Sequence, residues 1–530
     1  MALYFHDDYK ITSNLTLNLG LRWENQPPVY EVKDRLSSWN PSKIDPESGL
    51  PGAYDFAGTC KECTGSRSFG RRSLKDFGPR IGFAWRLKKA WTLRGAYGIM
   101  YEGDSPNGYN AVPLGKATSV AWGGTYLLAS DPVRPWAGIF NWDNGFPTDR
   151  FQPAGYDVSW GNRQRPGMID ANYGQTPYIQ NFTLNLQRGL GKYVLDLGYV
   201  GNKSTRLRFG ELQRINQLPP AVLSQYGTRL NNQVRNAAEA ASNGIRYPYP
   251  GFVGTVASAL RPYPQLQGNQ TVQVYGAPLG FSTYHALHVV LNREYANGLT
   301  LYSNYVFSKQ MTNTESSLIG DNDSKPLDYY NLKLEKMIGQ NDRTHTFKTY
   351  LSYDLPFARG KGWTNRLLGG WNIASIVNYA SGEPLEFTGS SPLSGGWNGA
   401  VNRLNVAAGP LKADGFHRNN FELSSALSPG NRYLNRAAFS DPALIPLTLG
   451  TGAYRYSQVR GFGNISENLT LTKSIALTEK VRFQLRSEFF NLFNRHQLGG
   501  ITTGINNPHF GQVTSVSGSR QAQISGRFDF

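Results

Sequence analysis

The sequence has few cysteines and no long apolar run. Cys60 and Cys63 are the only cysteines among 530 residues, which excludes a scaffold built from many disulfides. No stretch approaches the roughly 18 to 20 consecutive apolar residues of a transmembrane helix. The mean hydropathy is only -0.44. A membrane β-barrel remains compatible with this low value, because its strands alternate apolar and polar residues.

The chain also lacks the patterns of an enzyme or a metal centre. Its seven histidines are scattered, and the nearest two, His285 and His288, fall on opposite sides of a strand. No HExxH, GxSxG or phosphate-loop motif is present. We therefore expect no catalytic site, no metal site and no cofactor. The oxygen-rich run Asp321-Asn322-Asp323 could hold calcium, but it lacks the downstream glutamate of an EF-hand, and a solvated loop is the simpler interpretation.

The formal net charge of +17 allows three kinds of partner: nucleic acid, an anionic lipid or an anionic solute. Zinc-finger spacing, RNA-binding aromatic motifs and blocks of lysine or arginine are all missing, which argues against nucleic acid. The phosphates of lipopolysaccharide in an outer membrane explain the basic charge better.

The C-terminal residues alternate with a period of two. One side of the period carries only apolar residues and glycine, and the other carries Gln521, Gln523, Ser525, Arg527 and Asp529. This period predicts a strand with two unlike faces that runs to the last residue. Such a strand would be a sticky edge in a soluble sandwich, the alternative fold, whereas a closed membrane barrel needs it. The apolar side is Ala522, Ile524, Gly526, Phe528 and Phe530.

The same alternation recurs along the whole chain and predicts about thirteen strands. Short turns alternate with long connections, which is typical of an outer-membrane barrel with turns in the periplasm and loops outside. We therefore predict an all-β, transmembrane antiparallel β-barrel. The strands are expected near residues 2–9, 15–24, 77–87, 91–101, 182–186, 193–199, 287–291, 299–307, 347–355, 371–379, 469–475, 481–489 and 522–530, with long loops over 25–76, 102–177, 202–282, 309–342, 381–466 and 492–520.

An odd number of strands is unusual, because bacterial single-chain barrels have an even number. Residues 1–10 include Asp7 and Asp8 and have no apolar core, so they do not form a signal peptide. We therefore expect residues 1–530 to be the C-terminal part of a longer barrel.

Several blocks of the sequence resemble the Oar-like TonB-dependent transporters. Residues 4–24, YFHDDYKITSNLTLNLGLRWE, are similar to the pattern QDDWKVTPRLTLNLGLRYE of that family. Residues 282–309, 342–357, 369–385 and 481–497 resemble the same group, as do 247–265 and 435–442. The resemblance covers nearly the whole chain.

This resemblance implies a barrel of about 22 strands, filled by an N-terminal plug. A TonB-contacting box and a carboxypeptidase-regulatory-like domain would precede the plug. Substrate would bind the outer loops and plug, and TonB would then pull on the plug. The present chain would supply the last strands, without signal peptide, regulatory-like domain or plug, so TonB would act only through a plug that this chain lacks. Its final strand, with Ile524, Phe528 and Phe530, would be recognised by the barrel-assembly machinery, and the protein would be a monomer.

Charged residues that alternate with the apolar positions should line the barrel lumen, since a charge at the lipid midplane costs about 2 to 4 kcal/mol. We expect them to hydrogen-bond the plug rather than the substrate. Aromatic residues near strand ends should form the two interfacial girdles. The wall residues are Arg22, Glu24, Arg80, Arg86 and Arg94, and the girdle residues are Trp23, Trp85, Trp91, Tyr101, Tyr193, Tyr199, Trp371 and Tyr379.

Two features of the predicted loops have more than one interpretation. Cys60 and Cys63 are half of a zinc site at most, and a small disulfide in an oxidising exterior is favoured. Loop tryptophans lie among glycine, proline and asparagine, which suits ligand contact and loop packing equally. These tryptophans are Trp122, Trp136, Trp142 and Trp160.

The sequence thus predicts the barrel of a TonB-dependent receptor that transports a large or scarce solute. A surface-interaction barrel without transport and a passive porin-like barrel are the alternatives. The solute stays open among siderophores, glycans, peptides and exported proteins.

Overall fold

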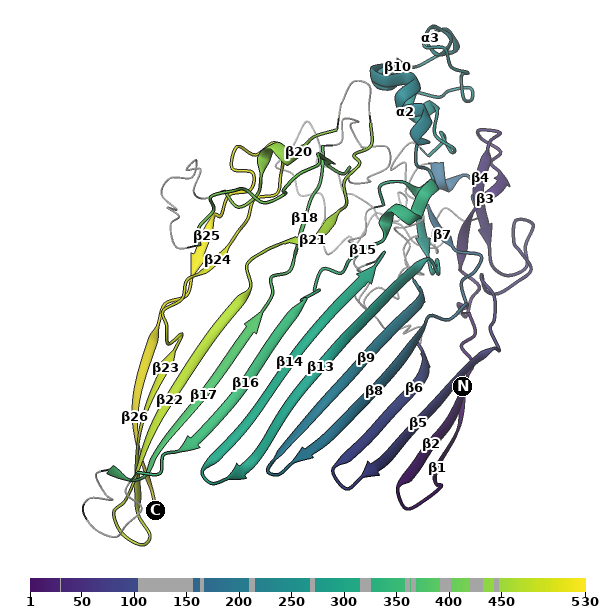
Figure 1. Ribbon diagram of the computed structural model, residues 1–530. Helices are drawn as coiled ribbons and strands as arrows, with labels where there is room; N and C mark the ends of the chain where they lie inside the picture. The colour runs from purple at the N-terminus through teal and green to yellow at the C-terminus, as the bar shows by residue number, and fades with distance from the viewer. Residues whose placement is uncertain are drawn as a thin grey trace, which may run out of the picture.

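The computed structural model is dominated by one antiparallel sheet (Figure 1). It describes residues 1–28, 30–102, 156–162, 166–208, 215–266, 272–314, 326–357, 363, 368–390, 402–418, 432–442 and 448–530. Thirteen long strands lie side by side in chain order, and the short β15 pairs with β14 beside this path. The long strands are β1 (Ala2–Lys10), β2 (Leu15–Glu24), β5 (Asp76–Lys88), β6 (Trp91–Tyr101), β8 (Tyr178–Leu190), β9 (Tyr193–Leu207), β13 (Gly280–Ala296), β14 (Leu299–Thr312), β16 (His345–Asp354), β17 (Trp371–Ala380), β22 (Asn464–Ala476), β23 (Arg482–Phe490) and β26 (Gln521–Asp529).

The predicted alternation of short and long connections is confirmed. Short turns join β1 to β2, β5 to β6, β8 to β9, β13 to β14, β16 to β17 and β22 to β23, and all lie at one end of the sheet (Figure 1). We call this the turn end. The long connections gather at the opposite end, the loop end, together with the N-terminus, while the C-terminus lies at the turn end (Figure 1).

The sheet has two edges rather than a closed circumference. Strand β1 pairs with β2 alone, and β26 pairs with β23 alone. All nine residues of β1 are exposed. The thirteen predicted strands are therefore present, but among the described residues they form an open sheet and not a complete barrel.

Register divides the side chains of the sheet into two faces, because residues directly opposite each other on antiparallel strands point the same way. Leu21 lies opposite Phe5 and Pro79, and Leu197 lies opposite Leu186 and Val289. We call this side the apolar face. The alternate positions form the polar face.

No layer formed by the described residues covers the apolar face. Ile81 is 52% exposed, and Leu184 and Leu287 are similarly open to the surroundings. Apolar surface that continues across thirteen strands far exceeds what a soluble monomer leaves in water. A lipid environment on this side removes that cost, since the inner strands pair with a neighbour on both sides through most of their length.

The buried cores lie in the long connections and not on the sheet. One core surrounds Leu230 and Phe252, a second Trp39 and Tyr54, and a third Phe387. Among the described residues no helix is long and apolar enough to cross a membrane. The short elements around these cores are β3 (Ser37–Ile44), β4 (Pro51–Phe56), β7 (Gly167–Ile169), β10 (Gln233–Val234), β11 (Gly254–Thr255), β12 (Gln273–Tyr275), β15 (Met337–Ile338), β18 (Pro384–Glu386), β19 (Asn405–Val406), β20 (Phe439–Ser440), β21 (Arg455–Arg460), β24 (Gln497–Gly499) and β25 (Ser515–Ser517), helices α2 (Pro220–Tyr226), α3 (Ala237–Ser242) and α4 (Val256–Ala259), and the 3-10 turns η1 (Trp160–Asn162), η2 (Gly227–Asn231), η3 (Tyr329–Glu335) and η5 (Arg436–Ala438).

The short helices between β9 and β13 begin where the sequence supplies caps. Pro220 occupies the first turn of α2, where a missing N–H costs nothing. The side chain of Asn236 accepts a hydrogen bond from the Glu239 backbone N–H at 2.9 Å, and Thr255 caps α4 in the same way through Ser258. Figure 1 shows α2 and α3 projecting beyond the loop end.

Several strand boundaries differ from the prediction. Strand β13 begins at Gly280 and β22 at Asn464, inside the expected loops 202–282 and 381–466. Residues 202 and 309 were expected to begin loops, but β9 continues to Leu207 and β14 to Thr312. The polar composition of residues 202–206 suggests a loop, yet these residues pair in register with both β8 and β13. Strand pairing does not require apolar side chains where the sheet emerges into water, so polarity alone misplaces the boundary.

Two hairpin turns depend on glycine to different degrees. In the turn from β13 to β14, Asn297 and Gly298 both have positive φ, 54° and 81°, as in a type I′ turn. A Cβ on Gly298 would lie 2.9 Å from the Asp354 backbone oxygen. Gly191, in the turn from β8 to β9, also has positive φ but would meet nothing within 4 Å.

We predict that Gly298→Ala destabilises the full-length protein more than Gly191→Ala does. Both substitutions incur backbone strain of about 1 to 2 kcal/mol, and only Gly298→Ala adds a steric clash. Urea unfolding of the protein in lipid vesicles measures the difference. Equal losses of free energy of unfolding in the two variants would contradict the packing of β16 against this turn.

Candidate functional site

All five predicted wall residues lie on the polar face of the sheet. Arg22 and Glu24 form an ion pair along β2. Arg80 has Gly20 opposite it on one neighbouring strand and Gly98 on the other. A Cβ on either glycine would lie 3.5 to 3.6 Å from the Cβ or Cγ of Arg80, which is an ordinary van der Waals contact. Arg86 and Arg94 lie further toward the turn end on the same face and are exposed.

Cross-strand hydrogen bonds run along the polar face in several places. Asn18 donates to Asp8 at 2.5 Å, and Asn202 donates to Asn181 at 2.7 Å. Near the turn end, Asn372 donates to Asp354 at 2.8 Å. Each pair consists of residues that the register places directly opposite each other. The polar face is thus a hydrogen-bonded surface that remains open to solvent or to another polar body.

All eight predicted girdle aromatics lie on the apolar face. Trp85, Trp91, Tyr193 and Trp371 lie near the turn end. Trp23, Tyr101 and Tyr379 lie near the loop end, but Tyr199 does not mark a strand end, because β9 continues for eight residues beyond it. The two girdles themselves stay a prediction.

Sequence reasoning missed the cations that accompany the turn-end aromatics. Arg188 lies opposite Trp91, Arg293 opposite Tyr193 and Lys473 opposite Trp371. Each cation lies over its partner's ring, at 4.7, 4.9 and 5.3 Å from the centroid. Each of these pairs joins two strands that no short turn connects. One sequence pattern could have predicted these cations: a basic residue at an apolar position of the alternation, within a few residues of a hairpin turn.

The long connections form one continuous structure, which we call the loop layer. It consists of residues 25–75, 102–177, 208–279, 313–344, 381–463 and 491–520, as far as the structure describes them. Adjacent connections are tied by hydrogen bonds. Asn162 in the second connection donates to Asp45 in the first, and Gln265 in the third donates to the Pro51 carbonyl in the first. Gln217 in the third connection donates to the Leu327 carbonyl in the fourth. The Leu434 backbone N–H in the fifth connection donates to the Gly511 carbonyl in the sixth.

Buried ion pairs tie the fourth connection to the fifth. The Arg403 guanidinium donates to Glu335 at 2.7 Å, and both side chains are almost fully buried. Glu335 also accepts from the Leu327 backbone N–H at 2.8 Å. Burial raises the pKa of the Glu335 carboxyl, and the positive charge of Arg403 opposes part of this rise. Asp342 and Arg460 form a second pair between the same connections at 2.6 Å.

The structure describes only some of the other loop residues that the sequence analysis singles out. Cys60 and Cys63 are joined by a disulfide in the first connection. Trp160 packs against the core that contains Trp39. Trp122, Trp136, Trp142 and residues 321–323 lie outside the described residues. No cluster of three or more potential metal ligands occurs in the described part of the chain.

The predicted C-terminal signal lies on the edge strand β26. Ile524 and Phe528 lie on the apolar face, and Phe530, which follows the strand, stacks its ring on Phe528. All three side chains are largely exposed. The ring of Phe528 packs on Phe483 with centroids 4.8 Å apart. Recognition by the assembly machinery stays a prediction.

A family model described as an outer membrane beta-barrel domain matches residues 1–523 of this chain. The chain belongs to this family. Its place in the cell is therefore the outer membrane, which agrees with the unprotected apolar face. None of the curated proteins compared with the chain matches it.

Several solved outer-membrane receptors are similar to the chain at low identity. The ferripyoverdine receptor of Pseudomonas aeruginosa is 10% identical with a TM-score of 0.39, and the match covers 100% of this chain and 38% of the receptor. The iron transporter FrpB of Neisseria meningitidis is 9% identical with a TM-score of 0.39, covering 100% and 44%. The alcaligin receptor of Bordetella pertussis is 9% identical with a TM-score of 0.32, covering 92% and 42%. The chain spans less than half the length of these proteins.

We predict that Glu335→Gln opens the loop layer between its fourth and fifth connections. The substitution leaves the Arg403 charge buried without a counter-ion, a change that costs about 3 to 5 kcal/mol in other proteins. Hydrogen exchange of residues 326–338 and 402–406 in the full-length protein measures the opening.

The matched control for this experiment is Glu383→Gln. Glu383 pairs with Arg343 at the same 2.7 Å distance, but both side chains are substantially exposed. Such pairs contribute about 0 to 1 kcal/mol, so exchange should barely change. Equal exchange in the two variants would show that the buried pair does not hold the loop layer together.

Proposed function

We propose that this chain forms the wall of a TonB-dependent receptor that actively transports a large or scarce solute across the outer membrane. The proposal rests on the polar face, which continues across thirteen strands and ends at the loop layer. The apolar face would contact lipid and the polar face would line the lumen. Family membership supports this orientation. The resemblance to Oar-like transporters supports the link to TonB.

The two open edges support a larger barrel. Unpaired strand edges inside a bilayer would leave backbone N–H and C=O groups without partners, at a cost of several kcal/mol each. Strands β1 and β26 each have one such edge. We infer that further strands close the wall, giving about 22 in total, as in large outer-membrane transporters.

The wall arginines would then contact a plug supplied by another part of the protein. Arg80, Arg86 and Arg94 are exposed on the polar face and carry donors suited to carbonyl and carboxylate acceptors. A wide lumen without a plug would be an open channel. A plug bound to these residues would instead seal the wall until TonB acts.

The loop layer supports a receptor rather than a passive pore. Its three buried cores and its ties between connections fix the shape of the outer surface before any ligand arrives. A preorganised surface binds a ligand with less loss of conformational entropy. A surface receptor without transport would use the same property, and it remains the second candidate function.

Uptake experiments distinguish these functions. Cells with and without the gene, and cells with the gene but without TonB, are given a mixture of ferric siderophores, oligosaccharides and peptides, and depletion is measured by mass spectrometry. We expect at least one solute to be taken up only when both the gene and TonB are present. Uptake that needs the gene but not TonB would indicate a passive pore. Binding without uptake would indicate a surface receptor.

We also predict that Arg80→Cys and Ile81→Cys place a probe in opposite environments. The two residues are adjacent on β5 and point to opposite faces. A nitroxide at position 81 should collide often with oxygen dissolved in lipid, and one at position 80 should do so less often, whether water or the plug covers it. Any access of a water-soluble nickel complex should be greater at position 80 than at position 81. Electron paramagnetic resonance of the full-length protein in membranes measures both. Similar accessibility at the two positions would overturn the assignment of the faces.

A further inference from the structure

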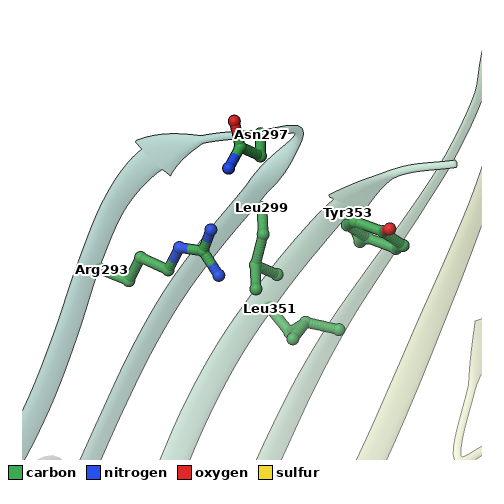
Figure 2. Close-up of a pocket in the computed structure, with 5 residues that line it drawn as sticks. All are labelled: Arg293, Asn297, Leu299, Leu351 and Tyr353. Atoms are coloured by element: carbon green, nitrogen blue, oxygen red, sulfur yellow. The ribbon is translucent and has the colours of Figure 1, made fainter. Parts of the chain in front are cut away.

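Arg293 combines a charge with an apolar groove at the turn end of the apolar face. It lies near the end of β13, three residues before the turn. Figure 2 shows its side chain extending toward Leu299, with Leu351 and Tyr353 beyond. These residues and Asn297 line a groove of about 370 Å³. The register places Leu299 opposite Tyr353, on the same face as Leu351, so the groove runs across β14 and β16.

The protein itself holds the guanidinium of Arg293 in place. One terminal nitrogen donates to the Tyr193 hydroxyl at 2.8 Å, and the other donates to the Ala296 carbonyl at 2.9 Å. The charge also lies over the Tyr193 ring. Each terminal nitrogen carries two N–H groups, so each can donate a second hydrogen bond. This geometry presents a fixed, charged fork to an anion with two oxygen acceptors.

The surroundings of this charge determine the class of ligand. An anion that approaches Arg293 from the apolar face must also occupy or border the groove of Leu299 and Leu351. A free phosphate would leave this apolar surface uncovered, whereas a diacyl phospholipid fits both parts. Its phosphate would bind the guanidinium, and one acyl chain would lie along the leucines.

We infer that this part of the sheet is a binding site for an anionic glycerophospholipid of the periplasmic leaflet. The inference rests on the proposed orientation, in which the turns lie at the periplasmic surface. Because lipopolysaccharide occupies the opposite leaflet, a ligand at the turn end is an ordinary phospholipid. The site would anchor the turn end at the level of the lipid phosphates.

Part of this combination recurs at a second place along the turn end. Lys473 lies opposite Trp371 and over its ring, but it is only 5% exposed and its ammonium donates to the Gly369 carbonyl, so it repeats the cation and the ring without an exposed charge. Trp371 borders a second apolar groove, of about 580 Å³, together with Leu355, Phe357, Leu368 and Leu471. Arg188 over Trp91 repeats the cation and the aromatic ring. This repetition at separate strand pairs indicates one level of the membrane where cations and acyl-chain surface meet.

Native mass spectrometry of the full-length protein with added phosphatidylglycerol tests the site. We expect Arg293→Gln to weaken retention of this lipid about fivefold, the loss typical of one basic residue at an anionic surface. Leu351→Trp should also weaken retention, because it fills the groove without changing the charge. Arg482→Gln is the matched control, since Arg482 lies at the turn end but on the polar face, and it should change nothing.

Arg293→Lys keeps the charge but loses the fork, and intermediate retention is expected. Heat-dependent gel mobility shows whether each variant forms a folded barrel. If Arg293→Gln does not fold, Arg293→Lys provides the test in its place. Equal retention by the parent and the folded Arg293 variants would overturn the site. Displacement of the lipid by inorganic phosphate alone would also overturn it, because the site would then bind a free anion. Lipid retention is measured without transport, so the two proposals can fail independently. The lipid site can be confirmed when no uptake is found, and uptake can be found when no lipid is retained.

Discussion

Backbone hydrogen bonding in lipid is the constraint on which the rest of this structure depends. Without water, each N–H and C=O in the membrane needs a partner on a neighbouring strand. Pairing fixes the register, and a slip of one residue would exchange the two faces of a strand. In the main sheet the register shifts only near Gly280, Arg86 and Arg293, all toward strand ends. The alternation is therefore unbroken through the middle of the sheet.

This constraint also explains why the buried cores lie outside the sheet. One face must meet lipid, and the other carries hydrogen-bonded polar residues such as Asn181 and Asn202. Neither face can pack on another layer of this chain. Apolar cores that are buried from water therefore form in the long connections, where Trp39, Phe252 and Phe387 are almost fully buried. The loop layer therefore acts as a small soluble structure attached to a membrane wall.

Much of the sheet could be predicted from sequence, because period-two alternation is a local signal. The turns were predictable for the same reason, as Asn297-Gly298 illustrates. The loop layer was not predictable, because its ties join residues far apart in the chain, such as Glu335 and Arg403. No sequence pattern around Glu335 or Arg403 indicates that these two residues form an ion pair. The wall arginines share one face of the sheet, as the alternation predicts. That this face lines a lumen stays a prediction, because alternation does not show what the arginines contact in a closed barrel.

The cations at the turn end support the proposed level of the sheet in the membrane. A lipid-facing Arg or Lys costs about 2 to 4 kcal/mol at the midplane but only about 0 to 1 near the interface. In the proposed orientation, with the turns at the periplasmic surface, Arg293 and its partner Tyr193 would lie near the periplasmic boundary. A strand tilted by about 40° needs about ten residues to cross an apolar band about 25 Å tall. Counted from Tyr193, the band ends near residue 203, where the polar end of β9 begins. In that orientation the polar residues at the end of β9 would lie above the lipid, where pairing with β8 and β13 keeps them in the sheet.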